Sequence, residues 1–157
     1  MKSLVLYDSV FGCTEKVSTA IGEALSRQGD CEVVKAADFT SDRLTGVDRL
    51  FIGSPTRAFR PTPELTAKLS ALHAGSLSGL PVHVFDTRVD ILKAPAVLRF
   101  MARLFGYAAG TLAKLVRAKG GTVVGEPVGF LVAGTEGPLL EGELERAVRF
   151  AESSEQP

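Results

Sequence analysis

The chain of 157 residues is 45% apolar and 23% charged, a balance typical of a folded globular domain and not of a disordered chain. Its length suits one domain, which we expect to span residues 1–152, with a frayed tail over 153–157. The 18 basic and 18 acidic side chains cancel, so no net charge attracts nucleic acid or an anionic membrane.

The two cysteines, Cys13 and Cys31, have neither a metal-ligand nor a redox-pair spacing. Two are also too few for a secreted disulfide scaffold, so we expect a reducing, cytoplasmic location. The apolar run at the N-terminus stops at Asp8 and is too short for a signal peptide or a membrane span.

Apolar runs of strand length alternate with helical patterns along the chain. Strands are predicted at 3–7, 31–36, 48–54, 81–87 and 122–134. Helices are predicted between the loop after Asp8 and Gly29, and over 62–72, 106–119 and 140–152. We expect the last strand to break at Pro127, because proline cannot donate to a central ladder. The alternation predicts an α/β fold, a doubly wound five-stranded parallel sheet with helices on both faces, since parallel strands need crossovers.

Ligands bind at the carboxyl edge of such a sheet, which three loops reach: 8–14, 54–62 and 86–106. The first, Ser9-Val10-Phe11-Gly12-Cys13-Thr14, leads directly into a predicted helix. A helix N-terminus offers unpaired N–H groups and a partial positive charge, so this loop predicts an anion site. The alternative is that Ser9 and Thr14 only cap the helix.

Other phosphate-binding motifs are absent from the sequence. It contains no G-x-x-x-x-G-K-[ST], and no G-x-G-x-x-G follows the first strand. A cysteine-dependent phosphatase would need an arginine closing the loop after Cys13, where the sequence reads TEKVST. A phosphoacceptor domain would need a carboxylate at the end of the third strand, where the chain has Gly53 and Ser54.

At this loop the sequence resembles the flavodoxin family. Residues 9–14 match the phosphate signature [ST]-x-x-G-x-T, placed between the first strand and the first helix as in that family. The segment 53–57, GSPTR, resembles the flavin-ring segment of flavin-dependent quinone reductases of the same fold. The resemblance covers essentially the whole chain and implies strand order 2-1-3-4-5, three layers and FMN as the cofactor.

The resemblance also implies which residues hold FMN. The hydroxyls of Ser9 and Thr14, with the N–H groups of residues 10–14, would bind its 5'-phosphate. The other two loops would line the isoalloxazine ring through Pro55, Thr56, Arg57, Ala58, Phe59, Asp86, Thr87 and Arg88. Phe59 is the nearest candidate for stacking, since the third loop has no aromatic residue between Asp86 and Pro95, where flavodoxins usually carry one.

The third loop is longer than the family requires. Residues 89–105 hold apolar side chains at helical spacing, with Arg99 and Arg103 one turn apart. They predict a short extra helix beside the flavin edge, acting as a lid or contributing to a homodimer contact. The alternative is a helix that simply extends the core.

Four cations, Arg57, Arg60, Arg88 and Lys93, fall in the two loops expected around the ring. A cation ~6 Å from the reduced, anionic ring stabilises it by roughly 3 kcal/mol at an effective dielectric of ~20, which corresponds to an upward shift on the order of 100 mV. We therefore expect a higher flavin potential than in flavodoxins that replace ferredoxin. The alternative is that these arginines are solvated or paired with carboxylates.

The sequence shows no evident nucleophile or acid–base pair, which favours an electron-transfer protein that exchanges electrons with a redox partner protein or a reductase. A second candidate is an NAD(P)H-dependent reductase of quinones or other small-molecule acceptors. A third is a flavodoxin-fold interaction module that has lost FMN.

Overall fold

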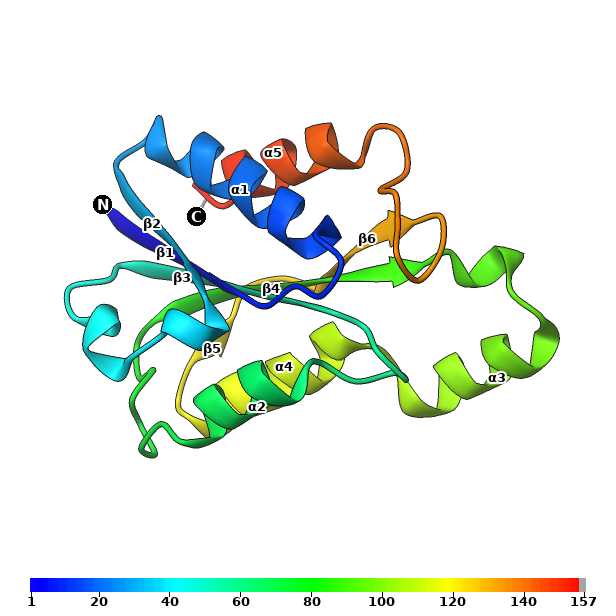
Figure 1. The fold of residues 1–157 in the computed structure, drawn as a ribbon. Coiled ribbons are helices and arrows are strands. Elements are labelled where there is room, and N and C mark those ends of the chain that lie inside the picture. The colour runs from blue at the N-terminus through cyan, green and yellow to red at the C-terminus, as the bar shows by residue number, and fades with distance from the viewer. Residues whose placement is uncertain (156–157) are drawn as a thin grey trace.

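The structure, a computed structural model, describes residues 1–155. All of its strand pairings are parallel. The strands are β1 (Lys2–Tyr7), β2 (Asp30–Lys35), β3 (Arg49–Pro55), β4 (Pro81–Val89), β5 (Thr122–Val123) and β6 (Val128–Val132). They follow the order β2-β1-β3-β4-β5, with β6 also paired to β4, which confirms the predicted order (Figure 1).

The fifth position of the sheet is filled by two short strands. β5 pairs with the start of β4, where Pro81 faces Thr122, and β6 pairs with its end, where Phe85 faces Val128. The interruption contains Pro127, whose missing N–H cannot continue the ladder. The predicted break is confirmed.

Helices cover both faces of the sheet (Figure 1). α1 (Cys13–Ser26) packs with α5 (Glu143–Ser153) on one face, and α2 (Pro63–Ser70) lies with α4 (Ala108–Ala118) on the other. The 3-10 turns η1 (Ala36–Asp38) and η2 (Ser41–Leu44) link β2 to β3.

Each face of the sheet has its own hydrophobic core. Side chains alternate along a strand, so Leu4 and Leu6 of β1 join the α2–α4 core while Val5 joins the α1–α5 core. The predicted three layers are confirmed.

The last helix differs at both ends from its prediction. It begins at Glu143 instead of residue 140, because the chain before it returns to β6, where Leu139 bridges to Val132. It runs to Ser153, and the N–H of Ser154 still donates to the Ala151 carbonyl. Of the tail predicted to fray, residues 156–157 lie outside the described part of the chain.

The segment after β4 forms the predicted extra helix. η3 (Ile91–Lys93) is followed by α3 (Ala96–Phe105), which projects beyond the end of the sheet (Figure 1). Within α3 only Ala102 is buried, so the alternative that this helix extends the core is wrong. Over residues 1–155, no helix is long and apolar enough to cross a bilayer.

Candidate functional site

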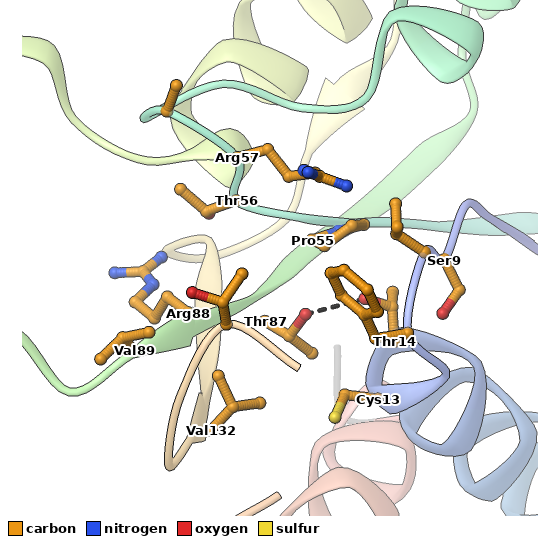
Figure 2. Close-up of a pocket in the computed structure, with 14 residues that line it drawn as sticks. Ser9, Cys13, Thr14, Pro55, Thr56, Arg57, Thr87, Arg88, Val89 and Val132 are labelled. Carbon is orange, nitrogen blue, oxygen red and sulfur yellow. Dashed lines mark hydrogen bonds between the residues drawn. The ribbon is translucent and has the colours of Figure 1, made fainter. Parts of the chain in front are cut away.

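A cavity of about 300 Å³ opens at the carboxyl edge of the sheet, between the start of α1 and the ends of β3 and β4 (Figure 2). It is lined by Ser9, Val10, Phe11, Cys13, Thr14, Pro55, Thr56, Arg57, Ala58, Thr87, Arg88, Val89, Val132 and Thr135. The three predicted loops therefore meet at one cavity. Of the predicted site residues, only Gly12, Phe59 and Asp86 are not part of its lining.

The loop 9–14 turns sharply into α1. Gly12 has a φ of 98°, a left-handed conformation that a residue with a Cβ adopts at a cost. The Ser9 Oγ accepts hydrogen bonds from the N–H groups of Gly12 at 3.1 Å and Glu15 at 3.3 Å. Ser9 therefore caps the loop, as the alternative interpretation expected, whereas the Thr14 hydroxyl pairs with that of Thr87 and does not cap the helix.

Capping leaves several donors of this loop unused. Within residues 1–155, the backbone N–H groups of Val10, Phe11, Cys13 and Thr14 donate to no other protein group. They lie at the N-terminus of α1, where the helix dipole adds partial positive charge. The mouth of the cavity at α1 thus offers four backbone donors to an anion.

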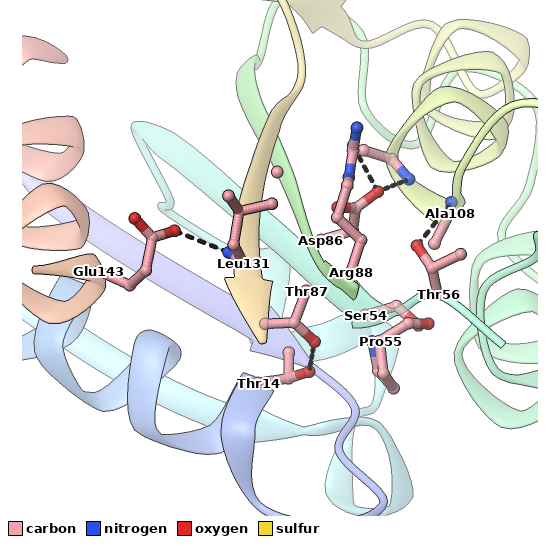
Figure 3. Close-up of polar contacts among 12 residues, drawn as sticks. Thr14, Ser54, Pro55, Thr56, Asp86, Thr87, Arg88, Ala108, Leu131 and Glu143 are labelled. Carbon is pink, nitrogen blue, oxygen red and sulfur yellow. Dashed lines mark hydrogen bonds and ion pairs between the residues drawn. The ribbon is translucent and has the colours of Figure 1, made fainter. Parts of the chain in front are cut away.

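Buried hydroxyl groups fix the three loops relative to one another. The Thr62 hydroxyl donates to Asp8 Oδ2 at 2.5 Å, joining the first and second loops. The Thr14 and Thr87 hydroxyls lie 2.7 Å apart, joining the first and third (Figures 2 and 3). Thr62 directly precedes α2, but its side chain makes no bond to that helix.

The second loop contains a two-residue turn in an unusual conformation. Arg57 and Arg60 exchange backbone hydrogen bonds of 2.8 and 2.9 Å, and the residues between them, Ala58 and Phe59, have φ values of 47° and 67°. Such turns favour Asn-Gly, since both positions need positive φ. The turn is therefore strained, and it carries Ala58 to the cavity wall.

The predicted stacking residue, Phe59, does not reach the cavity. The same turn directs its ring toward α3, where it lies 6.0 Å from the ring of Phe105. The aromatic ring at the cavity is that of Phe11, which is half exposed and has the Arg57 guanidinium 5.6 Å from its centre. In the sequence-based prediction, Phe11 contributes only its backbone N–H group. Its large apolar ring, in a loop of mostly small residues, could have indicated a side chain at the ligand.

Arg88 is not a free cation beside the cavity. Its guanidinium makes a double hydrogen bond with Asp86, with Nε–Oδ1 at 2.7 Å and Nη2–Oδ2 at 2.8 Å (Figure 3). Asp86 is fully buried and also accepts from the N–H of Ala109 at the start of α4. The ring of Tyr107 lies 3.7 Å from the Arg88 guanidinium. For Arg88, the alternative of pairing with a carboxylate is therefore confirmed, in place of the expected free cation beside the ring.

A fourth segment, from the end of β6 toward α5, also contributes to the cavity through Val132 and Thr135. Glu143 anchors this segment by accepting a 2.7 Å hydrogen bond from the N–H of Leu131 (Figure 3). Burial alone would raise the pKa of Glu143, but hydrogen bonds from Arg146 and Leu131 outweigh it and lower the pKa. The sequence carried no motif for this segment.

The cavity lining contains no His, Asp or Glu. Within residues 1–155, no three His, Cys, Asp or Glu side chains are grouped to hold a metal ion. The lining combines backbone donors, hydroxyls, one free arginine and apolar surface, which suits binding of a planar ligand with an anionic group.

An open parallel sheet with helices on both faces and a ligand-sized cavity at its carboxyl edge defines a doubly wound α/β binding protein. The model of the flavodoxin domain matches residues 4–130. The chain therefore belongs to the flavodoxin family.

Solved structures agree on the fold. Flavodoxin 2 from Bacillus cereus is 20% identical, with a TM-score of 0.75 and 100% of each chain covered. A short-chain flavodoxin associated with a PDU bacterial microcompartment is 17% identical, with a TM-score of 0.74, 97% of this chain and 95% of that chain covered. Two-electron reduced Megasphaera elsdenii flavodoxin is 19% identical, with a TM-score of 0.68 and coverage of 96% and 98%. No curated protein sequence matches the chain.

Proposed function

We propose that the cavity binds FMN noncovalently and that the protein is an electron carrier. The observation that carries this proposal is the set of unused N–H groups at the start of α1, which open on a cavity of about 300 Å³. One terminal phosphate suits such a helix N-terminus. Bound FMN would supply the redox chemistry.

The proposed site divides into a phosphate end and a ring end. The loop 9–14 would hold the phosphate through its unused N–H groups, those of Val10, Phe11, Cys13 and Thr14, and through the Thr14 hydroxyl. The segments 55–58 and 87–89 lie on two sides of the cavity and would contact the ring (Figure 2). Phe11, at the rim, replaces Phe59 as the proposed aromatic contact.

The charge around the ring end is lower than the sequence suggested. Arg88 is compensated by Asp86, which leaves Arg57 in the cavity lining and Arg60 in the adjoining turn. Neither makes an ion pair within residues 1–155. We propose that Arg57 raises the flavin potential, because a nearby cation favours the reduced, anionic ring.

A redox partner protein or a reductase is the proposed source and destination of electrons. The cavity lining offers no acid–base pair for substrate chemistry, which favours a carrier. The second candidate, an NAD(P)H-dependent reductase, is favoured by the two unpaired arginines, which line a hollow beside the cavity together with Asp8 and Glu64 and would contact an anionic nicotinamide cofactor or acceptor. A cytoplasmic location is part of the proposal, since both cysteines are free thiols.

Titration of the apoprotein into FMN, followed by flavin fluorescence, tests the binding proposal. We expect saturable quenching by FMN and at least roughly 100-fold weaker binding of riboflavin, which lacks the charged group that the helix N-terminus would bind. Equal affinities would overturn the assignment of the phosphate loop. If the protein quenches the fluorescence of neither FMN nor riboflavin, the third candidate, an interaction module without FMN, becomes the proposed function.

The flavin-loaded protein then separates carrier from reductase. Rapid bleaching of its visible absorbance by NADPH alone would establish the reductase. We expect slow bleaching by NADPH alone and fast bleaching when a flavodoxin reductase is added.

A further inference from the structure

Helix α3 turns its apolar side outward. Val97, Phe100 and Leu104 are 68%, 64% and 64% exposed, and their spacing places them on one stripe of the helix. Ala102, on the opposite side, is buried. A surface helix ordinarily buries its apolar stripe against the core, so this orientation indicates that another surface covers α3.

Cationic side chains lie beside the apolar stripe, on the side of α3 that faces η3 and in η3 itself. Lys93, Arg99 and Arg103 are exposed and make no ion pair within the described residues 1–155. The sequence contains no Asp or Glu between Asp90 and Glu126. The zero net charge of the chain therefore conceals a segment that attracts anions.

A hollow of about 540 Å³ lies between η3 and α3. Arg99 and Arg103 line it together with apolar side chains that include Ile91, Leu92 and Tyr107. Guanidinium groups bind phosphate through paired hydrogen bonds. Their position beside apolar walls fits a phosphate that is attached to hydrocarbon.

We propose that α3 docks the protein on the surface of an anionic phospholipid bilayer. Val97, Phe100 and Leu104 enter the boundary between headgroups and acyl chains, while Lys93, Arg99 and Arg103 contact lipid phosphates. A helix whose apolar stripe adjoins a basic side lies in this plane of a bilayer. The proposal does not depend on the proposed flavin function.

Two other occupants suit α3 less well. A second copy of the chain would bring Arg99 and Arg103 near an equally basic segment that contains no carboxylate. A protein interface usually buries roughly 800 Å² per partner, more than one face of a projecting helix of 10 residues supplies. A bilayer covers such a helix without a matching groove.

Co-sedimentation of the full chain with vesicles tests the proposal. We expect binding to vesicles of phosphatidylcholine with phosphatidylglycerol, and at least roughly 100-fold weaker binding to phosphatidylcholine alone. Salt should weaken the binding. Absence of binding to the anionic vesicles, or equal binding to both, would overturn the proposal.

Matched variants separate α3 from the rest of the surface. Arg99→Glu/Arg103→Glu should weaken vesicle binding roughly 100-fold or more, and Phe100→Ser/Leu104→Ser should abolish it. The controls are Arg149→Glu and Leu144→Ser, exposed positions of α5 on the opposite face of the sheet, which should bind as wild type. Circular dichroism melts establish that each variant is folded. Full binding by the α3 variants would contradict the proposal.

A single-tryptophan reporter follows insertion directly, since the chain contains no Trp. The emission of Phe100→Trp should shift to the blue on anionic vesicles and be quenched by brominated lipids, whereas that of Leu144→Trp should not change.

Either of two results, from other experiments, would overturn the proposal. One is a dimer in sedimentation equilibrium that the Phe100→Ser/Leu104→Ser variant no longer forms, which would make a second copy of the chain the partner of α3. The other is binding of the chain to polyglutamate beads without binding to vesicles, which would make an acidic protein the partner of α3.

Discussion

The hydroxyl groups of Thr14 and Thr87 lie 2.7 Å apart and form a buried hydrogen bond between the first turn of α1 and the end of β4. The two residues are 73 positions apart in the sequence, and both belong to loops that line the cavity. The bond makes the proposed phosphate loop and the third loop one unit, because neither can shift without leaving a buried hydroxyl unpaired.

Replacing Thr87 with valine tests this link. Thr87→Val keeps the shape of the side chain but leaves the Thr14 hydroxyl without its partner, so the free energy of unfolding should fall by about 1–3 kcal/mol. Urea denaturation followed by circular dichroism measures the loss. In the double variant Thr14→Val/Thr87→Val no polar group remains unpaired, and part of the stability should return. Losses that simply add would show that the bond does not couple the two loops.

The left-handed conformation of Gly12 gives a second prediction. Gly12→Ala places a Cβ on a residue with a φ of 98° and should cost about 1–2 kcal/mol of unfolding free energy. It should also weaken FMN binding, because the neighbouring N–H groups turn with the backbone. Thermal melts and flavin titration measure the two effects.

Gly110→Ala is the matched control for Gly12. Gly110 lies inside α4 with open space around its Cβ position, so alanine should stabilise the protein by about 0.5–1 kcal/mol. If both substitutions had the same sign, backbone conformation would not explain the role of Gly12.

The sequence was sufficient for features that depend on local pattern. Alternating apolar runs and helical stripes placed the strands and helices, and the break at Pro127 followed from its missing N–H. The loop 9–14 was identified because its key positions have local structural roles, in which Ser9 caps, Gly12 turns and Thr14 lies in the first turn of α1. Such roles are fixed by neighbours in the chain.

The sequence did not determine the direction of side chains whose partners lie far away in the chain or compete with one another. Phe59 was expected over the cavity, but its direction depends on the turn 57–60 and on Phe105 of α3. The pairing of Arg88 with Asp86 agrees with the alternative that the sequence left open, since residues two apart on a strand share a face. The outward apolar stripe of α3 was not predictable, because periodicity locates a stripe but not the surface that covers it.

Neutralising Asp86 should release the charge of Arg88. Asp86→Asn removes one partner of a buried ion pair, so the free energy of unfolding should fall by about 3 kcal/mol. In the FMN-loaded protein, the flavin midpoint potential should rise by tens of mV, because the guanidinium is no longer compensated. Arg88→Met is the matched variant: it should also destabilise the fold, but without raising the potential. A rise in both variants would exclude the charge of Arg88 as its cause.

Arg57 is the cation that remains in the cavity lining. Arg57→Gln should lower the flavin midpoint potential, by an amount on the order of 100 mV or less after solvent screening. Spectroelectrochemical titration measures the shift. The control is Arg27→Gln, an exposed arginine at the far end of α1, which should leave the potential unchanged. An unchanged potential in Arg57→Gln would mean that Arg57 is solvated and does not act on the ring.

The buried ring of His83 should make the free energy of unfolding depend on pH. Its ring is buried in the sheet, stacked 4.5 Å from the ring of Phe51. Burial, together with the charge of Arg49, lowers the pKa of His83 to about 4. The unfolded chain has a His pKa near 6.5, so between pH 6.5 and 4 it binds more protons than the folded protein. Stability from this residue is therefore complete above pH 6.5 and is lost as the pH falls toward 4.

The loss should reach roughly 3 kcal/mol across this window, measured by urea denaturation at a series of pH values. Carboxylates titrate in the same range, so the comparison is with His83→Phe, which retains a stacked ring but has no titrating group. Between pH 6.5 and 4, the free energy of unfolding of His83→Phe should fall by roughly 3 kcal/mol less than that of wild type. His73→Gln, at an exposed position after α2, should retain the full wild-type dependence. A His83→Phe profile parallel to that of wild type would mean that the carboxylates alone cause the loss.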